Sequence, residues 1–536
     1  MAKTRIKRGE RVYVYERENY RDSSGKVKHR NTRYLGIEVT IDGEKQIIPP
    51  KKRFKEFEVT KSVKYGDIAV LYDLFTQYGL SELLNGLIPR RGLLPVGEVF
   101  AALAINHIID RETLNKFSKW YQDTELEELT GITSKKLNST NLDAVMNTCR
   151  KIGPEGIVDV CIELFNKIKH LEAESSTMIY DITSTYFYST KMPKARRGYS
   201  RDDNSLPQIN IGLVVTKNKG LPVLFRTYEG NITDVRTVEQ LIADVKRVNL
   251  SIDVIVMDRE MVSRNKIITL DGENLKMICG IPLTSNEAKE LVMRDISEEN
   301  ELMRPSGLIY YEDLATSLFG IPGRAIICFN HSDLEIERTA RLKKIGIAEI
   351  KVAELLSSQT GNETMASSEK ELKEAIRGVY DYFVIKKDGN EITVNPHAEN
   401  RRKARLRDGK SLLFTTNFEK SASEIIATYF GKDVVEKIFD CSKNGLDLQP
   451  VRHFEEGNID VYVFVCYLAY LTLALYKHHL GVTDWAGVED SLDELGRIRK
   501  TTLDFGSEKQ DKISALSKEQ KEIIEKLGFA DAFFGL

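Results

Sequence analysis

Two short apolar runs near the middle of this 536-residue chain each end in an aspartate. Residues 254–257 read V-I-V-M before Asp258, and residues 177–180 read T-M-I-Y before Asp181. Runs of this length and composition are typical of buried strands. Burying a carboxylate without a partner is costly. Each aspartate therefore predicts a cation, hydrogen-bond donors or solvent at the end of its strand.

The segments around these runs predict an α/β fold with a mixed sheet. Three consecutive strands are expected within 177–230, followed by an amphipathic helix over 234–248. A fourth strand is expected over 253–258, and a fifth over 275–283 after a further helical stretch. This order of strands and helices is typical of a mixed sheet with helices packed on it.

Each aspartate also has a purely structural interpretation. Asp258 can cap a helix that begins around Met261, and Asp181 can form an Asx-turn with Thr183. Neither aspartate alone distinguishes a structural role from a catalytic one.

A helix predicted over 421–443 supplies a third element. Four of its residues fall within an arc of roughly 60° at about 100° per residue. These residues are Tyr429, Lys432, Glu436 and Lys443. The face thus combines an aromatic ring, two cations and one carboxylate, although solvated charged faces are common. Three carboxylates from two strands and a helix are the hard oxygen ligands that a pair of divalent ions takes.

The spacing Tyr429-x2-Lys432-x3-Glu436-x6-Lys443 resembles the Y-R-E-K signature of a group of bacterial insertion-sequence DDE transposases, with lysine in the arginine position. The segments "YDITSTYF" and "VIVMDREMVS" are similar to the two aspartate motifs of that group. Together with their flanking segments, these motifs cover about 175–290 and 408–480. Glu260 departs from the group, in which glycine usually follows the Asp-Arg pair.

The resemblance implies a ribonuclease-H-like catalytic core that carries a DDE triad. Asp181, Asp258 and Glu436 would be the catalytic residues and would hold two Mg²⁺ or Mn²⁺ ions. DNA contacts would come from Tyr429, Lys432, Lys443 and Arg259.

The expected function is DNA transposition. The protein would bind the terminal inverted repeats of its element, cut there and join the freed end to target DNA. The implied setting is a homodimer in a synaptic complex, in the bacterial cytoplasm near the nucleoid. Neither a membrane nor a small-molecule substrate is expected. Two alternatives stay open: a metal-dependent nuclease on the same fold, and a domesticated DNA-binding protein that no longer cuts.

The N-terminal region is strongly basic. Residues 1–55 hold 16 Lys or Arg against 7 Asp or Glu, although the whole chain has a net charge of -2. Strand-like runs over 11–20 and 26–36 flank an Asp22–Gly25 turn, which predicts a β-hairpin. Its basic residues and tyrosines suit a nucleic-acid-binding arm, and a solvated charged hairpin has the same pattern.

The remaining chain divides by its periodicity. Helical spacing over 61–170 predicts either a DNA-binding module or a plain helical bundle.

Residues 461–476 are too few to span a bilayer, so they predict a helix in a protein core. The predicted domains are a hairpin arm over 1–60, a helical region over 61–170, a catalytic core over 171–290 and 409–485, an insertion subdomain over 291–408, and a helical tail over 486–536. The six cysteines form no C-x-x-C pair, so zinc and a disulfide framework are not expected.

Overall fold

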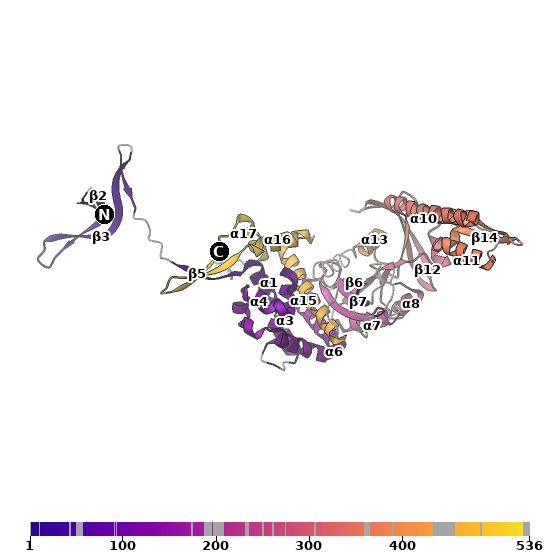
Figure 1. Cartoon of the computed structure of the whole chain (residues 1–536), viewed down its shortest axis with the longest axis horizontal. Coiled ribbons are helices and arrows are strands. Elements are labelled where there is room, and N and C mark those ends of the chain that lie inside the picture. The colour runs from indigo at the N-terminus through magenta and orange to yellow at the C-terminus, as the bar shows by residue number, and fades with distance from the viewer. Residues whose placement is uncertain are drawn as a thin grey trace. The chain divides into compact units, whose positions relative to one another are not determined.

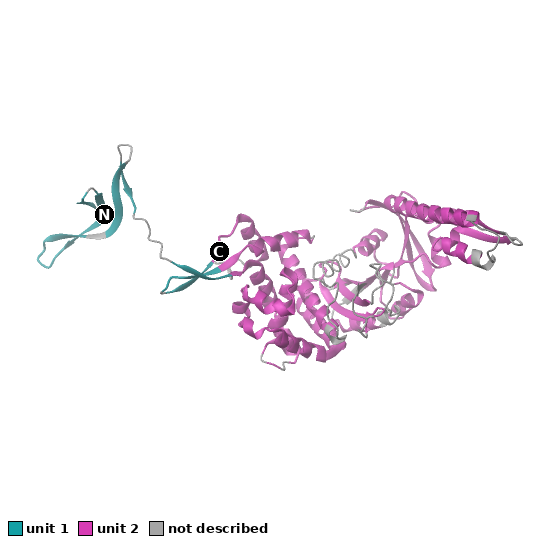
Figure 2. Cartoon of the chain, viewed as in Figure 1, with its two compact units in different colours: residues 1–62, 501–512 teal, residues 63–500, 513–536 magenta. Residues whose placement is uncertain are grey.

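The structure is a computed structural model of the whole chain (Figure 1). It describes residues 2–528, except for the following positions: 10, 42–43, 50–56, 90–91, 93, 173–174, 187–193, 195, 197–207, 231–234, 249–250, 260–261, 274, 305–306, 359–364, 389–390, 432–455, 483–484 and 507. Two compact units divide the chain: residues 1–62 with 501–512, and residues 63–500 with 513–536 (Figure 2).

The N-terminal strands form a four-stranded antiparallel sheet in the order β1-β2-β3-β4. Its strands are β1 (Ala2–Arg8), β2 (Arg11–Arg21), β3 (Val27–Ile41) and β4 (Glu44–Ile48). The turn between β2 and β3 is held by Asp22, whose Oδ1 accepts hydrogen bonds from the backbone N–H groups of Ser24 and Lys26. The strands expected at 11–20 and 26–36 are present, and β1 and β4 enlarge the expected hairpin into a sheet.

The region predicted to be helical contains six α-helices among its described residues. They are α1 (Gly66–Gln77), α2 (Leu80–Leu87), α3 (Val96–Ile109), α4 (Leu114–Gln122), α5 (Leu126–Thr130) and α6 (Ser139–Ile168). Helix α6 kinks where Gly153 takes a φ of 71° before Pro154. A proline cannot continue the helical hydrogen bonding, so the kink follows from the sequence.

Helix α15 (Glu456–Leu480) packs against α3, α6 and strand β8. Its segment 459–480 is long and apolar enough to cross a membrane, but 94% of its most apolar stretch is buried inside the protein. The prediction of a core helix over 461–476 is confirmed.

The region after α15 was expected to be helical throughout, and it is not. Besides α16 (Ala486–Gly496) and α17 (Lys518–Leu527), it contains β17 (Arg499–Asp504) and β18 (Lys509–Ile513), which form a sheet with β5 (Glu58–Lys64).

The central sheet is mixed, as predicted, and its strand order is β11-β12-β13-β16-β10-β9-β6-β7-β8. The five strands expected from the sequence are β6 (Ser175–Tyr186), β7 (Gln208–Thr216), β8 (Pro222–Glu229), β9 (Ser251–Met257) and β10 (Met277–Ile281). Strands β6, β9 and β10 run parallel, and the other neighbours are antiparallel. Helices α7 (Val235–Arg247) and α8 (Arg264–Gly272) connect β8 to β9 and β9 to β10.

Residues 291–408 do not form one separate insertion. Strands β11 (Glu301–Arg304), β12 (Gly307–Leu318) and β13 (Ile321–Asn330) extend the central sheet, where β13 pairs with β16 (Lys410–Thr415). The reason is the apolar run 325–328 of β13, in which every residue is at most 2% exposed. A strand buried on both faces fits the interior of a large sheet.

The later part of this region has a hydrophobic core of its own. Its elements are α10 (His331–Ser358), α11 (Met365–Ala375), β14 (Phe383–Asp388), β15 (Glu391–Pro396) and α12 (Ala398–Arg407). Ile345, Val352, Leu372, Ile376 and Phe383 are among the residues that fill this second core.

Candidate functional site

Asp181 and Asp258 each lie one residue beyond the last pair of residues that are aligned between the neighbouring parallel strands β6 and β9. That pair is Tyr180 of β6 and Met257 of β9. Neighbouring strands are about 4.8 Å apart, and side chains at the same step of a parallel pair share a face of the sheet. The structure therefore brings these two predicted site residues together at the edge where β6, β9 and β10 run toward their carboxyl ends.

Asp181 is not at the end of its strand, contrary to the expectation from its sequence. Strand β6 continues to Tyr186 through its antiparallel pairing with β7, in which Asp181 is opposite Leu213. Only the parallel neighbour β9 ends at this level. This extended backbone also shows that the Asx-turn interpretation of Asp181 is wrong. The carboxylate is 7% exposed and its Oδ1 accepts a hydrogen bond from the Ile182 N–H at 2.8 Å.

Asp258 is not the N-cap residue of helix α8. Helix α8 begins at Arg264, and Ser263 is its N-cap residue. The Asp258 Oδ1 instead accepts the backbone N–H of Arg259 at 2.7 Å. Asp258 is partly exposed. The residues around Met261, where the capped helix was expected, lie outside the described part of the chain, so the capping interpretation stays a prediction.

Tyr429 reaches Asp258 from helix α13 (Ala422–Phe430), which packs over β9 and β10. Its hydroxyl donates a hydrogen bond to the Asp258 Oδ1 at 3.1 Å, and the residue is only 6% exposed. Burial, followed by the Asp258 charge, raises the pKa of Tyr429 far above its usual value. The hydroxyl thus remains a donor at any physiological pH. Tyr429 therefore contacts Asp258, and its expected contact with DNA stays a prediction.

Gly280 of β10 leaves the space that Tyr429 occupies. A Cβ at this position would overlap the Tyr429 hydroxyl oxygen and lie 2.8 Å from its Cζ. A glycine inside an apolar strand often marks such a close approach. The run M-I-C-G-I was therefore a signal for this contact that the sequence interpretation missed.

We expect Gly280→Ala to push Tyr429 off Asp258. Overpacking of this kind costs about 1–3 kcal/mol of stability. A displacement of the carboxylate by about 1 Å can lower the cleavage rate about a hundredfold. Thermal unfolding and a DNA cleavage assay measure the two effects.

Gly272→Ala is the matched control, because nothing lies within 4 Å of a Cβ added there. Adding Tyr429→Phe to Gly280→Ala removes the overlapping oxygen, so the double variant should recover part of the stability and none of the activity. Equal behaviour of Gly280→Ala and Gly272→Ala would contradict the role of this contact.

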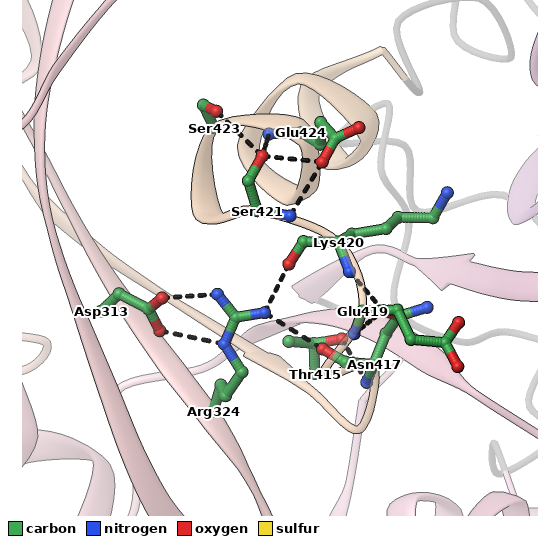
Figure 3. Close-up of polar contacts among 9 residues, drawn as sticks. All are labelled: Asp313, Arg324, Thr415, Asn417, Glu419, Lys420, Ser421, Ser423 and Glu424. Carbon is green, nitrogen blue, oxygen red and sulfur yellow. Dashed lines mark hydrogen bonds and ion pairs between the residues drawn. The ribbon is translucent and has the colours of Figure 1, made fainter.

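The other end of α13 is fixed to the sheet by Arg324 of β13 (Figure 3). Its Nη1 donates to the carbonyl oxygens of Asn417 at 3.2 Å and Lys420 at 2.6 Å, and Asp313 pairs with the same guanidinium. Ser421 and Glu424 then form a capping box at the start of the helix. Such a box satisfies the first backbone N–H groups of a helix. These contacts set the direction in which α13 presents Tyr429.

Cationic groups surround the C-terminal end of α13. The Arg304 guanidinium of β11 lies 3.9 Å from the centroid of the Phe430 ring. Lys217 donates to the Thr428 hydroxyl at 2.8 Å. Arg259, which was predicted to contact DNA, is exposed beside Asp258. Arg304 and Lys217 were not anticipated, because residues this distant in the chain carry no local motif.

Glu436, Lys432 and Lys443 lie outside the described residues, as does Glu260. The helix predicted over 421–443 is described as far as Phe430. Within the described ranges, no group of three or more His, Cys, Asp or Glu side chains is placed to hold a metal ion. Asp181 and Asp258 contribute two carboxylates, and the third predicted ligand is one of the residues not described.

A search of curated protein sequences found no match, and two other comparisons with known proteins found matches. In one comparison, the solved structures that match this chain include the piggyBac transposase synaptic complex with hairpin DNA, at 10% identity and a TM-score of 0.35, covering 80% of this chain and 79% of that one. Another is the Drosophila P element transposase strand transfer complex, at 12% identity and a TM-score of 0.19, covering 79% and 86%.

The second comparison is with family models. The model described as "Transposase DDE domain" matches residues 172–472. This range is more than half of the chain and contains both aspartates and all of α13. The protein therefore belongs to the transposase DDE domain family.

Proposed function

We propose that this protein is a DNA transposase that binds the terminal inverted repeats of its own element, cleaves the DNA there and transfers the freed strand to a target. The observation that carries the proposal is the position of Asp181 and Asp258, which occupy the same step of neighbouring parallel strands within the matched domain. Two carboxylates so placed in a DNA transposase suit phosphoryl transfer.

The strand order supports a ribonuclease-H-like core as part of the proposal. Strands β6, β7 and β8 form an antiparallel meander, and β9 and β10 then add in parallel on the other side of β6. The signature helix α13 covers β9 and β10 at the edge where the aspartates lie. The Y-R-E-K signature and an origin in a bacterial insertion sequence belong to the same proposal.

Asp181 and Asp258 fit a divalent cation. Two carboxylates on adjacent strands repel each other, and hard oxygen ligands are those that Mg²⁺ and Mn²⁺ prefer. Glu436 would complete the set, with two ions held by the three side chains. When bound, such ions lower the pKa of water and neutralise charge on the reacting phosphate.

The residues around the carboxylates have separable tasks. Tyr429 would orient the Asp258 carboxylate through its hydrogen bond to Oδ1. Arg259 and Arg304 place positive charge at the same edge, where they can contact DNA phosphates. Lys432 and Lys443 would add phosphate contacts further along the signature segment. These contacts would position the scissile phosphate against the aspartates.

The two chemical steps share one site. In cleavage, a water oxygen attacks phosphorus and the bond to the 3′ oxygen breaks, which leaves a free 3′-hydroxyl. In strand transfer, that hydroxyl attacks a phosphorus of target DNA and displaces another 3′ oxygen. Both are in-line displacements that need no covalent enzyme intermediate.

The test is incubation of the protein with Mg²⁺ or Mn²⁺ and DNA that carries the element's ends, with products mapped to the nucleotide. We expect cuts at the ends and joined products in the target. Cutting without joining would favour a nuclease. Binding without either product would favour a protein that no longer cuts.

The N-terminal sheet is proposed to bind DNA through its positive charge. Deleting residues 1–55 should weaken binding to the ends and make it less sensitive to salt, because each neutralised phosphate releases counterions. Strand β5 starts at Glu58 and would be retained. Filter binding at several salt concentrations measures both effects. An unchanged affinity and salt slope would leave this sheet as a solvated structure.

We also propose the setting implied by this chemistry. Two copies would act together in a synaptic complex of two ends, in the bacterial cytoplasm near the nucleoid. No small-molecule substrate and no membrane is part of the proposal.

A further inference from the structure

Helix α10 (His331–Ser358) carries aliphatic side chains on two opposite sides. One side is anchored in the second core through Ile345, Ala348 and Val352. Arg341 fixes the same side by pairing with the buried Asp408. These contacts leave the opposite side of the helix facing solvent.

The outward side carries large aliphatic residues. Ile336 is 66% exposed, Ile347 is 47% exposed and Ile350 is 61% exposed. Ile347 and Ile350 are three residues apart and so are neighbours on the helix surface, where exposed apolar residues that adjoin one another can form part of an interaction site.

The exposed residues follow a heptad spacing. Steps of four and three residues alternate along one line of the helix surface, which is the pattern of a coiled-coil seam. The six residues of this line, here called the α10 seam, are Ile336, Ala340, Lys343, Ile347, Ile350 and Glu354. All six are exposed.

We propose that the α10 seam pairs with the α10 seam of a second copy of this chain, in antiparallel orientation. Placing Ile347 of one copy opposite Ile350 of the other also places Lys343 opposite Glu354. Because the pair is two-fold symmetric, each contact occurs twice. The two isoleucine layers are then bracketed by opposite charges, which is the complementarity that fixes register in coiled coils.

The residues beside the seam suit a close but weak contact. Thr339, Gly346 and Ala353 are small and line one flank, so the two helices can approach closely. Lys344 and Lys351 line the other flank, where they would repel their counterparts. The two Ile347–Ile350 contacts and the two Lys343–Glu354 contacts together bury less surface than a stable dimer needs. The seam therefore suits association that is completed when both copies are held on DNA.

This contact would join the two copies that a synaptic complex requires, and that role rests on the proposed function. The contact itself does not, because it can be measured without DNA or metal. Failure of self-association and failure of cleavage are thus separate results.

The test is sedimentation velocity of the full chain, from about 1 μM to about 200 μM, without DNA. The parent protein should show a concentration-dependent monomer–dimer equilibrium. Lys343→Glu and Glu354→Lys should each raise the dimer dissociation constant about tenfold, because each places like charges opposite one another in two layers. The double variant Lys343→Glu/Glu354→Lys restores opposite charges and should return to within about threefold of the parent.

Ile347→Lys should have a larger effect and abolish the dimer. Its matched control is Leu342→Lys, which changes a residue of α10 that is 52% exposed but lies about 120° away from the seam. A protein that stays monomeric throughout would overturn the proposal. So would charge reversals whose effects add in the double variant, or a Leu342→Lys variant that loses the dimer as Ile347→Lys does.

Discussion

Asp181→Asn should lower DNA cleavage by about a thousandfold or more, while binding to the element's ends persists. Asparagine keeps the size of the side chain and its hydrogen bond from the Ile182 N–H, but it lacks the negative charge that a divalent cation requires. Loss of one member of a catalytic group that acts as a unit usually costs this much. Asp258→Asn should have the same effect, because its carboxylate occupies the same step of the neighbouring strand.

Asp271→Asn serves as the control for both variants. Asp271 is an exposed carboxylate on α8, so its replacement changes net charge equally without touching the site. Band-shift assays and cleavage of labelled ends measure the two activities. Asp181→Asn protein that binds and cuts at the parental rate would show that the site is misassigned.

Glu436→Gln should likewise abolish cleavage and spare DNA binding. The expectation rests on the signature spacing from Tyr429, which the structure places against Asp258. Glutamine preserves size and removes the ligand charge. We expect a loss of about a thousandfold in single-turnover cleavage.

Glu260→Gln is the informative comparison for Glu436→Gln. Glu260 follows Asp258 by two residues and is the other carboxylate near the predicted triad in sequence. It should cut at close to the parental rate. The reverse outcome, with Glu260→Gln inactive and Glu436→Gln active, would reassign the third ligand.

The strands of the site could be predicted because their apolar runs are local signals. Residues 254–257 and 277–281 are buried from end to end, as strands covered on both faces require. The end of β6 could not be predicted in the same way. Its length past Asp181 depends on pairing with β7, which is set by partners some 30 residues away in sequence.

The contacts of Tyr429 also could not be predicted from the sequence of its own helix. Helical spacing placed it on one face with Lys432 and Glu436, but spacing does not say what that face meets. Its partner Asp258 comes from β9 and the space for its ring comes from Gly280 of β10. Contacts between elements this far apart in the chain depend on tertiary packing.

The structure of the predicted insertion, residues 291–408, also depends on contacts that are distant in sequence. Its polar helix and isolated strands suggested a separate subdomain, and only the part from α10 to α12 has its own core. The apolar run in β13 was visible in the sequence, but whether it extends the catalytic sheet depends on β16, more than 80 residues later.

The most direct test of the central claim is a crystal structure of the protein with Mn²⁺ and an uncleavable DNA end, with anomalous scattering used to locate the metal. The account predicts Mn²⁺ density in contact with the carboxylates of both Asp181 and Asp258, and loss of that density in Asp181→Asn crystals. Mn²⁺ bound only elsewhere, or bound equally well by the Asp181→Asn protein, would contradict it.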